Sequence, residues 1–455
     1  MLTFLYLITF LIVVVFCLRR IIRNKYISLF PIFTITIAVL YLFVPAMIFL
    51  FASYDKQNSD LIAIVHNSST LDRISIYLLV LLCIAAISIP QKVGVSQDIP
   101  YRRLRKPVNY DVRRIRHIAY NVCKKWFWGL WLIGFVCTLG MIADIGLEGF
   151  IIYSGSARGE GDLQLESGSL FAYASNFSRF LIASLAPGIL MYEIKKNKKL
   201  GVVLIITFVL SIMLQIFDAG KTGFIIFLIP IFIHWLTRKG LIKIKHLVLF
   251  AVALVALVPF LDNIFYFISR GESIENYRDS WNFLNYIMSV VQQFTYPYAN
   301  MVMREPITEI YGYRLFLDYL AIPVNLIPAS LIGGFELDTL YHLTTEYYSS
   351  ILSSKGGMPN DFLFFSYRQL GVIGILIIGI VTGAIINKLD RTMFSVKGSL
   401  DVLNINTAHY FISFCLSGVV FILIEPLSIL TAFPMSIFVA IVALHLNYRL
   451  RAALK

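Results

Sequence analysis

Long apolar stretches recur along the sequence and are separated by clusters of Lys and Arg. A helix needs about 20 mainly apolar residues to cross roughly 30 Å of hydrocarbon. Applied along the chain, this rule predicts an all-α polytopic membrane protein with about 11 transmembrane helices, so that residues 1–455 form a single transmembrane domain. The predicted spans are 2–18, 29–52, 74–89, 126–146, 170–192, 200–217, 222–237, 246–268, 361–387, 402–424 and 427–447.

The composition supports this class. Hydrophobic residues make up 58% of the chain and charged residues only 14%, whereas a water-soluble domain carries about 25% charged residues. The first apolar stretch has no basic segment before it and is followed directly by Arg19 and Arg20. We therefore expect it to be a permanent first helix rather than a cleaved signal peptide.

The distribution of charge predicts the orientation. If the segment after the first span is cytoplasmic, so are 90–125, 193–199, 237–245, 388–401 and the C-terminus. These segments hold about 28 of the 39 Lys and Arg residues but only about 5 of the 26 acidic residues. The prediction is therefore N-terminus out and C-terminus in. The stretch 90–125 is then a basic cytoplasmic loop, and the net charge of +13 records topology rather than binding of nucleic acid.

The opposite side is expected to carry an outer loop at 147–169 and one large outer loop at 269–360. The large loop contains apolar or amphipathic pieces from Trp281 to Met303 and from Leu315 to Ile332. We expect interfacial helices here, because polar and charged residues interrupt both pieces. Two further spans, giving 13 in total, are the alternative.

Cations on the expected outer side run against the charge rule, and several lie in settings typical of an anion site. Arg158, Lys221 and Arg270 each lie next to a glycine, which allows backbone N–H groups to approach an anion closely. Arg368 lies near the outer end of a span, where an uncompensated charge is costly and usually functional. The pattern favours an external, membrane-level site for an anionic ligand over unrelated interfacial cations. No cysteine spacing indicates a metal site.

Three short motifs and the loop layout resemble a known family. The motifs are Ser154-Gly155-Ser156-Ala157-Arg158-Gly159, Gly220-Lys221-Thr222-Gly223, and Lys355-Gly356-Gly357-Met358-Pro359-Asn360-Asp361 followed by Tyr367-Arg368-Gln369-Leu370-Gly371-Val372-Ile373-Gly374. Together with the large late outer loop, they resemble the Wzy-type polymerases of O-antigen and capsular oligosaccharide repeat units. The resemblance covers the architecture of most of the chain.

This resemblance implies a glycosyltransferase of the bacterial cytoplasmic (inner) membrane, embedded in the lipid bilayer and acting at its outer face on undecaprenyl-pyrophosphate-linked oligosaccharides. A sugar hydroxyl would attack the anomeric carbon of the growing chain and displace lipid pyrophosphate, whose charge Arg and Lys can stabilise. The candidate pyrophosphate-binding residues are Arg158, Lys221, Arg270, Arg278 and Arg368. The candidate bases are His342, Asp361 and Glu272. We expect no cofactor and no metal, and the candidate protein partners are a chain-length regulator and a flippase.

Other functions remain open at this point. An O-antigen ligase would need the same cationic outer site. A lipid-linked oligosaccharide flippase or other transporter is expected to show repeated halves and ionisable or broken helices near mid-membrane, and the sequence has no internal repeat. A metal-dependent lipid-sugar glycosyltransferase is disfavoured because residues 53–73 lack an evident acidic pair. A purely structural membrane protein is the last alternative.

Overall fold

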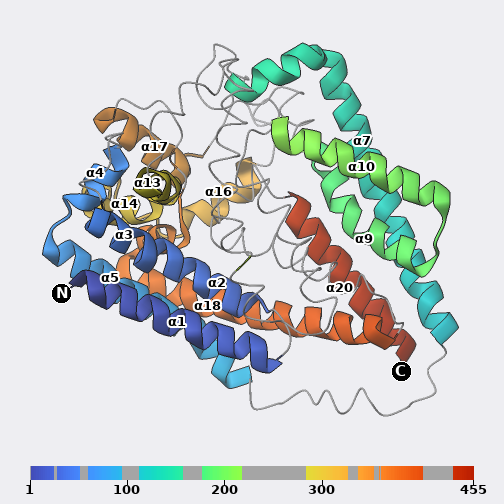
Figure 1. Ribbon diagram of the computed structural model, residues 1–455, viewed down its shortest axis with the longest axis horizontal. Coiled ribbons are helices and arrows are strands. Elements are labelled where there is room, and N and C mark those ends of the chain that lie inside the picture. Colours follow the sequence, from blue (N-terminus) through green and yellow to red (C-terminus); the bar gives the residue numbers. More distant parts are fainter. Residues whose placement is uncertain are drawn as a thin grey trace.

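The computed structural model describes residues 2–24, 28–51, 60–94, 112–156, 177–217, 249, 283–325, 337–352, 358, 360–402 and 434–454. Every regular element within these residues is helical, which confirms the all-α class. Two groups of long helices form the body (Figure 1). The first contains α1 (Leu2–Asn24), α2 (Leu29–Ala38) continued by η1 (Val39–Phe43) and α3 (Val44–Phe51), α5 (Thr70–Gly94) and α18 (Phe362–Val402). The second contains α7 (Val112–Ser156), α9 (Phe180–Ile194), α10 (Lys198–Phe217) and α20 (Pro434–Leu454).

Among the described residues, five helices are long and apolar enough to cross a membrane, which indicates a membrane-embedded protein. They are Leu2–Ile22, Leu29–Phe51, Thr70–Gln91, Arg113–Ala143 and Phe362–Thr392. Each overlaps a span predicted from the sequence. Helices α10 and α20 overlap two more, whereas the described α9 has only 15 residues. The predicted spans 222–237, 246–268 and 402–424 lie outside the described residues, apart from Leu249 and Val402.

Helix α7 is longer than the sequence predicts at both ends. It begins at Val112, within the predicted loop 90–125, and ends at Ser156, within the predicted loop 147–169. Near its start Ile115, Ala119 and Val122 are buried while the basic residues between them are exposed. This spacing is the apolar face of an amphipathic helix. The basic residues therefore mark an exposed helix face, which charge counting does not distinguish from a loop.

The predicted loop 269–360 contains short helices in its described part. They are α13 (Phe283–Gln293), α14 (Tyr296–Val302), α15 (Arg304–Tyr311), α16 (Leu317–Asn325) and α17 (Leu340–Ile351). The longest has 12 residues, well below the length that a span requires. The piece from Trp281 to Met303 is thus two short helices over its described residues, which disfavours an additional span there.

These short helices gather at one end of the first group, together with α4 (Asp60–His66) (Figure 1). The Tyr6 hydroxyl donates to the Arg73 carbonyl at 2.6 Å and lies 2.9 Å from the Tyr298 hydroxyl. The starts of α1 and α5 and the helix α14 therefore meet at this end. At the opposite end, the Asp390 carboxylate of α18 accepts the Leu29 N–H at 2.6 Å and so caps α2.

Helices α5 and α18 run in the same direction and approach closely through glycine. A Cβ atom added to Gly383 would lie 2.4 Å from the Ile87 carbonyl oxygen, and one added to Gly379 would lie 2.8 Å from the Ala86 Cβ. The two glycines are four residues apart and so share one helix face, as in the small-residue contacts of membrane helices.

We predict that Gly383→Ala destabilises the protein by about 1–3 kcal/mol, because the new methyl group must push the two helices apart. Thermal unfolding in detergent measures this. Gly140→Ala is the matched control, because a Cβ at Gly140 meets nothing within 4 Å. An unchanged unfolding temperature for Gly383→Ala would contradict the tight contact.

Candidate functional site

A break in α18 lies at the centre of the candidate site. The first two turns end at Leu370 (φ −158°, ψ 37°) and Gly371 (φ 61°, ψ −140°), after which the helix resumes in a new direction. Asp361 caps the start of these turns, since its Oδ1 accepts the N–H groups of Leu363 and Phe364 at 3.0 Å each. Residues 362–369 thus form a short half-helix that precedes the main part of α18.

The segment between α15 and α16 satisfies the carbonyl groups that this break releases. The Arg314 N–H donates to the Arg368 carbonyl at 2.9 Å, and the Leu315 N–H donates to the Gln369 carbonyl at 3.0 Å. Leu315 and Phe316 have positive φ values of 48° and 64°. Such values are costly for bulky side chains and persist only where surrounding contacts enforce them.

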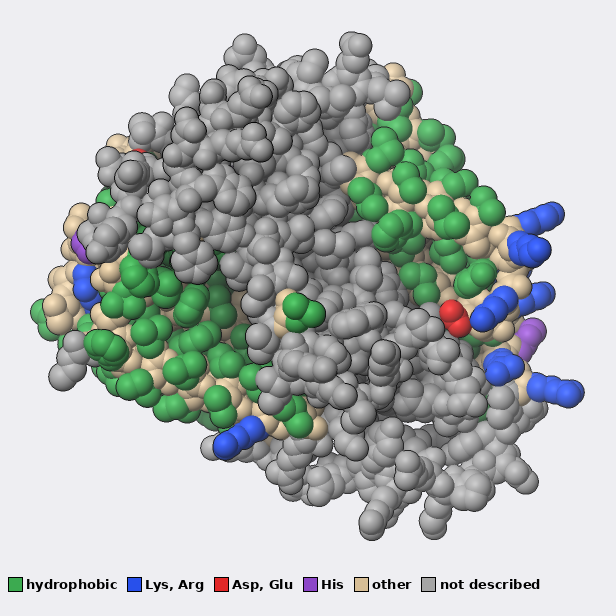
Figure 2. All heavy atoms as spheres, in the orientation of Figure 1, with side chains coloured by type: hydrophobic (Ala, Val, Ile, Leu, Met, Phe, Trp, Pro, Cys, Tyr) green, Lys and Arg blue, Asp and Glu red, His purple; other side chains and the backbone are tan. Residues whose placement is uncertain are grey.

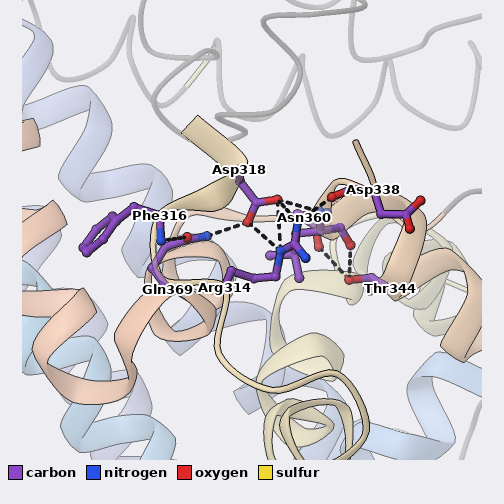
Figure 3. Close-up of polar contacts among 8 residues, drawn as sticks. Arg314, Phe316, Asp318, Asp338, Thr344, Asn360 and Gln369 are labelled. Carbon is purple, nitrogen blue, oxygen red and sulfur yellow. Dashed lines mark hydrogen bonds and ion pairs between the residues drawn. The ribbon is translucent and has the colours of Figure 1, made fainter. Parts of the chain in front are cut away.

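A buried polar network fixes this segment against α18 (Figure 3). Asp318 is fully buried and pairs with Arg314 at 3.2 Å. Its carboxylate also accepts the Leu340 N–H at 2.8 Å and the Gln369 side-chain amide at 2.8 Å. The Gln369 Oε1 accepts the Phe316 N–H at 2.9 Å. One carboxylate therefore joins α16, α17 and the half-helix of α18.

Arg368 lies on this half-helix and is fully buried. Its Nη1 donates to the Thr308 hydroxyl at 2.7 Å. That hydroxyl donates to the Arg304 carbonyl at 2.5 Å and must therefore accept from Arg368. The Arg368 Nε and Nη2 atoms are buried without a partner among the described residues, and no described carboxylate forms an ion pair with this guanidinium. A buried cation with two free donors is costly, and its planar fork matches two oxygens of a phosphate or carboxylate.

A second buried arginine attaches α15 to α5. Arg304 pairs with Glu305 at 3.0 Å and with Asp72 at 3.7 Å, and its Nη1 donates to the Met301 carbonyl at 2.7 Å. Its guanidinium also lies 5.8 Å from the centre of the Tyr367 ring. Arg304 therefore has carboxylate partners, which Arg368 lacks among the described residues, and we assign Arg304 a structural role.

The tyrosines of this region are poor candidates for a base. Burial raises the pKa of Tyr319 to about 12, and the Asp318 carboxylate adds to the shift. Burial likewise raises the pKa of Tyr348. Both phenols are therefore protonated at neutral pH.

The structure places only part of the predicted site. Asp361 caps the half-helix that carries Arg368, and both Asp361 oxygens accept hydrogen bonds, Oδ2 from Asn300 at 3.4 Å. His342 is exposed on α17 with its ring 5.9 Å from that of Tyr341. The other predicted site residues lie outside the described part of the chain, namely Glu272, Arg158, Lys221, Arg270 and Arg278. No group of three or more His, Cys, Asp or Glu side chains among the described residues is arranged to hold a metal ion.

Sequence reasoning did not predict the residues that support Arg368. Arg314 and Asp318 are four residues apart with opposite charge, a spacing that indicates a helical ion pair. The sequence therefore indicates the ion pair, but it does not indicate that the pair is buried. Thr308 and Gln369 carry no comparable signal, because their roles depend on the break in α18.

Comparison with protein-family models, with curated proteins and with solved structures finds no match to this chain.

Proposed function

We propose that this protein is a polymerase that joins undecaprenyl-pyrophosphate-linked oligosaccharide repeat units into an O-antigen or capsule. The observation that carries the proposal is Arg368, a fully buried guanidinium whose Nε and Nη2 lack partners in the described part of the chain. Further support comes from its place within the segment 355–374, on which the resemblance to Wzy-type polymerases rests.

The proposed reaction needs an anion site more than it needs a cofactor. The acceptor hydroxyl forms a bond to the anomeric carbon of the growing chain, the bond from that carbon to the pyrophosphate oxygen breaks, and undecaprenyl pyrophosphate leaves. The hydroxyl proton passes to a base, for which His342, Asp361 and Glu272 remain the candidates. Negative charge develops on the leaving oxygen, and preorganised donors in a water-poor site stabilise such charge more strongly than water does. Arg368 is proposed to supply two of these donors.

The proposal includes the topology and location predicted from the sequence. About 11 spans, with the N-terminus out and the C-terminus in, place the start of α18 at the outer face of a bacterial cytoplasmic membrane. The gathering of α13–α17 beside the starts of α1 and α5 is consistent with this orientation. Lipid-linked substrates on the outer leaflet would then meet Arg368 at membrane level. Arg158, Lys221, Arg270 and Arg278 are proposed as further contacts to the pyrophosphate.

The first test is a gel profile of surface polysaccharide from cells that lack the gene, complemented with wild type or with Arg270→Ala. We expect the deletion to lose the long-chain ladder and retain a single repeat unit, with wild type restoring the ladder and Arg270→Ala failing to do so. Long chains that persist on the lipid carrier without reaching their final acceptor would identify a ligase instead. An unchanged ladder in the deletion strain would contradict the enzyme proposal and would favour the transporter alternative.

A further inference from the structure

Three helix ends meet at one end of the second helix group. They are the start of α7, the turn between α9 and α10, and the end of α20. The Trp126 indole of α7 donates to the His445 ring of α20 at 2.9 Å. The Lys195 ammonium of the turn lies 6.0 Å from the centre of the Tyr120 ring of α7. Segments far apart in the sequence therefore present one continuous surface, which we call the basic end.

The basic end carries a large excess of positive charge. Its exposed cations are Arg113, Arg114, Arg116, Lys124, Lys125, Lys195, Lys196, Lys198, Lys199 and Arg449. Glu193 is the one acidic residue within 113–126, 192–200 and 441–450. Figure 2 shows Lys and Arg side chains clustered along the right edge of the molecule, with a single acidic group beside them. Lys198 and Lys199 also stand at the positive end of α10, so the local helix does not compensate their charge.

An apolar band adjoins this charged end. The Trp128 side chain is 42% exposed, and one turn further along α7 the side chains of Leu132 and Ile133 are exposed as well. On α10 the exposed Val202, Ile205 and Ile206 follow the lysines directly. Figure 2 shows this green surface next to the cluster of Lys and Arg. This order of side chains, from cations through a tryptophan to aliphatic residues, is the one expected from the headgroup region of a bilayer into its hydrocarbon.

We propose that the basic end binds the headgroups of anionic phospholipids, with the lysines of the α9–α10 turn as principal contacts. A juxtamembrane cluster of Lys and Arg is attracted to anionic lipid, and the apolar band holds the cluster at headgroup depth. A lipid, unlike a nucleic acid or a free phosphate, uses both features, because its acyl chains lie along the exposed aliphatic side chains. The inference depends on membrane embedding alone, so it stands or falls separately from the polymerase proposal.

Lys196 and Lys198 are the most informative residues for a test. Both are exposed, and neither side chain forms a hydrogen bond or ion pair with any residue that the structure describes. Their replacement by glutamine therefore removes charge without removing a described contact. Arg19→Gln with Lys388→Gln is the matched control, since both residues are exposed, lie outside the basic end and remove the same charge.

The experiment titrates the full-length protein in zwitterionic detergent with phosphatidylglycerol or phosphatidylcholine and follows the thermal unfolding midpoint. We expect phosphatidylglycerol to raise the midpoint more than phosphatidylcholine does. Lys196→Gln/Lys198→Gln should weaken the apparent affinity for phosphatidylglycerol by roughly ten- to thirtyfold, and added salt should reduce the difference. The control variant should retain wild-type affinity.

Three results would overturn the inference. Equal stabilisation by both lipids would show that charge plays no part. An equal loss of affinity for phosphatidylglycerol in the lysine variant and in the control variant would show a general effect of charge rather than a site at the basic end. A midpoint shift of the same size with inorganic phosphate alone would identify a site for a soluble anion rather than a lipid.

Discussion

Replacement of Arg368 by glutamine should abolish long-chain polysaccharide while leaving the protein as stable as wild type, or more stable. Loss of a preorganised donor to a developing oxyanion lowers turnover by about a hundredfold or more. The same change removes a fully buried cation whose Nε and Nη2 have no described partner, which relieves a desolvation cost in the absence of substrate. Polysaccharide gels measure the first effect, and thermal unfolding of the purified protein measures the second.

Two further variants make this prediction specific. Arg368→Lys keeps the charge but loses the planar fork, so we expect a ladder nearly as poor as that of Arg368→Gln. Lys388→Gln removes an exposed cation near the other end of the same helix and should leave the ladder intact. A normal ladder in Arg368→Gln would refute the anion site. A large fall in its unfolding temperature would instead assign Arg368 a structural role.

Replacement of Asp318 by alanine should give the largest loss of stability, about 3–5 kcal/mol. The Asp318 carboxylate is fully buried and accepts from Arg314, Gln369 and the Leu340 N–H. Its removal leaves the Arg314 guanidinium, with a side chain only 13% exposed, without its carboxylate, and it leaves two further donors unsatisfied. The half-helix that carries Arg368 would then lose its attachment to α16 and α17, so activity should fall as well.

Asp338→Asn is the matched control for this change. Asp338 is exposed. Arg314 donates to its backbone carbonyl, which an asparagine at this position retains. We expect this substitution to change the free energy of unfolding by less than about 0.5 kcal/mol. Thermal or denaturant unfolding in detergent compares the two variants. Equal stability of Asp318→Ala and Asp338→Asn would show that the network contributes little to the fold.

The site was only partly predictable from the sequence. The sequence identifies Arg368 because an uncompensated charge near the outer end of an apolar span is costly, a signal that the local sequence carries. Asp361 stays a candidate base, and the structure adds that its carboxylate caps the half-helix, a role that the sequence did not predict. The role of Asp318 depends on Gln369 and Leu340, which lie 51 and 22 residues away in the sequence. No local pattern reports contacts over such separations.

The all-α class and the position of every described helix long enough to span could be predicted from the sequence, because apolar length is a local property that hydrocarbon thickness selects. The break of α18 at Gly371 depends instead on tertiary packing, as does the segment before α16 that satisfies the released carbonyl groups. The burial of Arg368, with two donors that have no partner among the described residues, and the basic surface formed by three distant helix ends also depend on this packing. These features arise from packing between segments far apart in the chain, where burial and hydrogen-bond partners are set by neighbours that the local sequence does not specify.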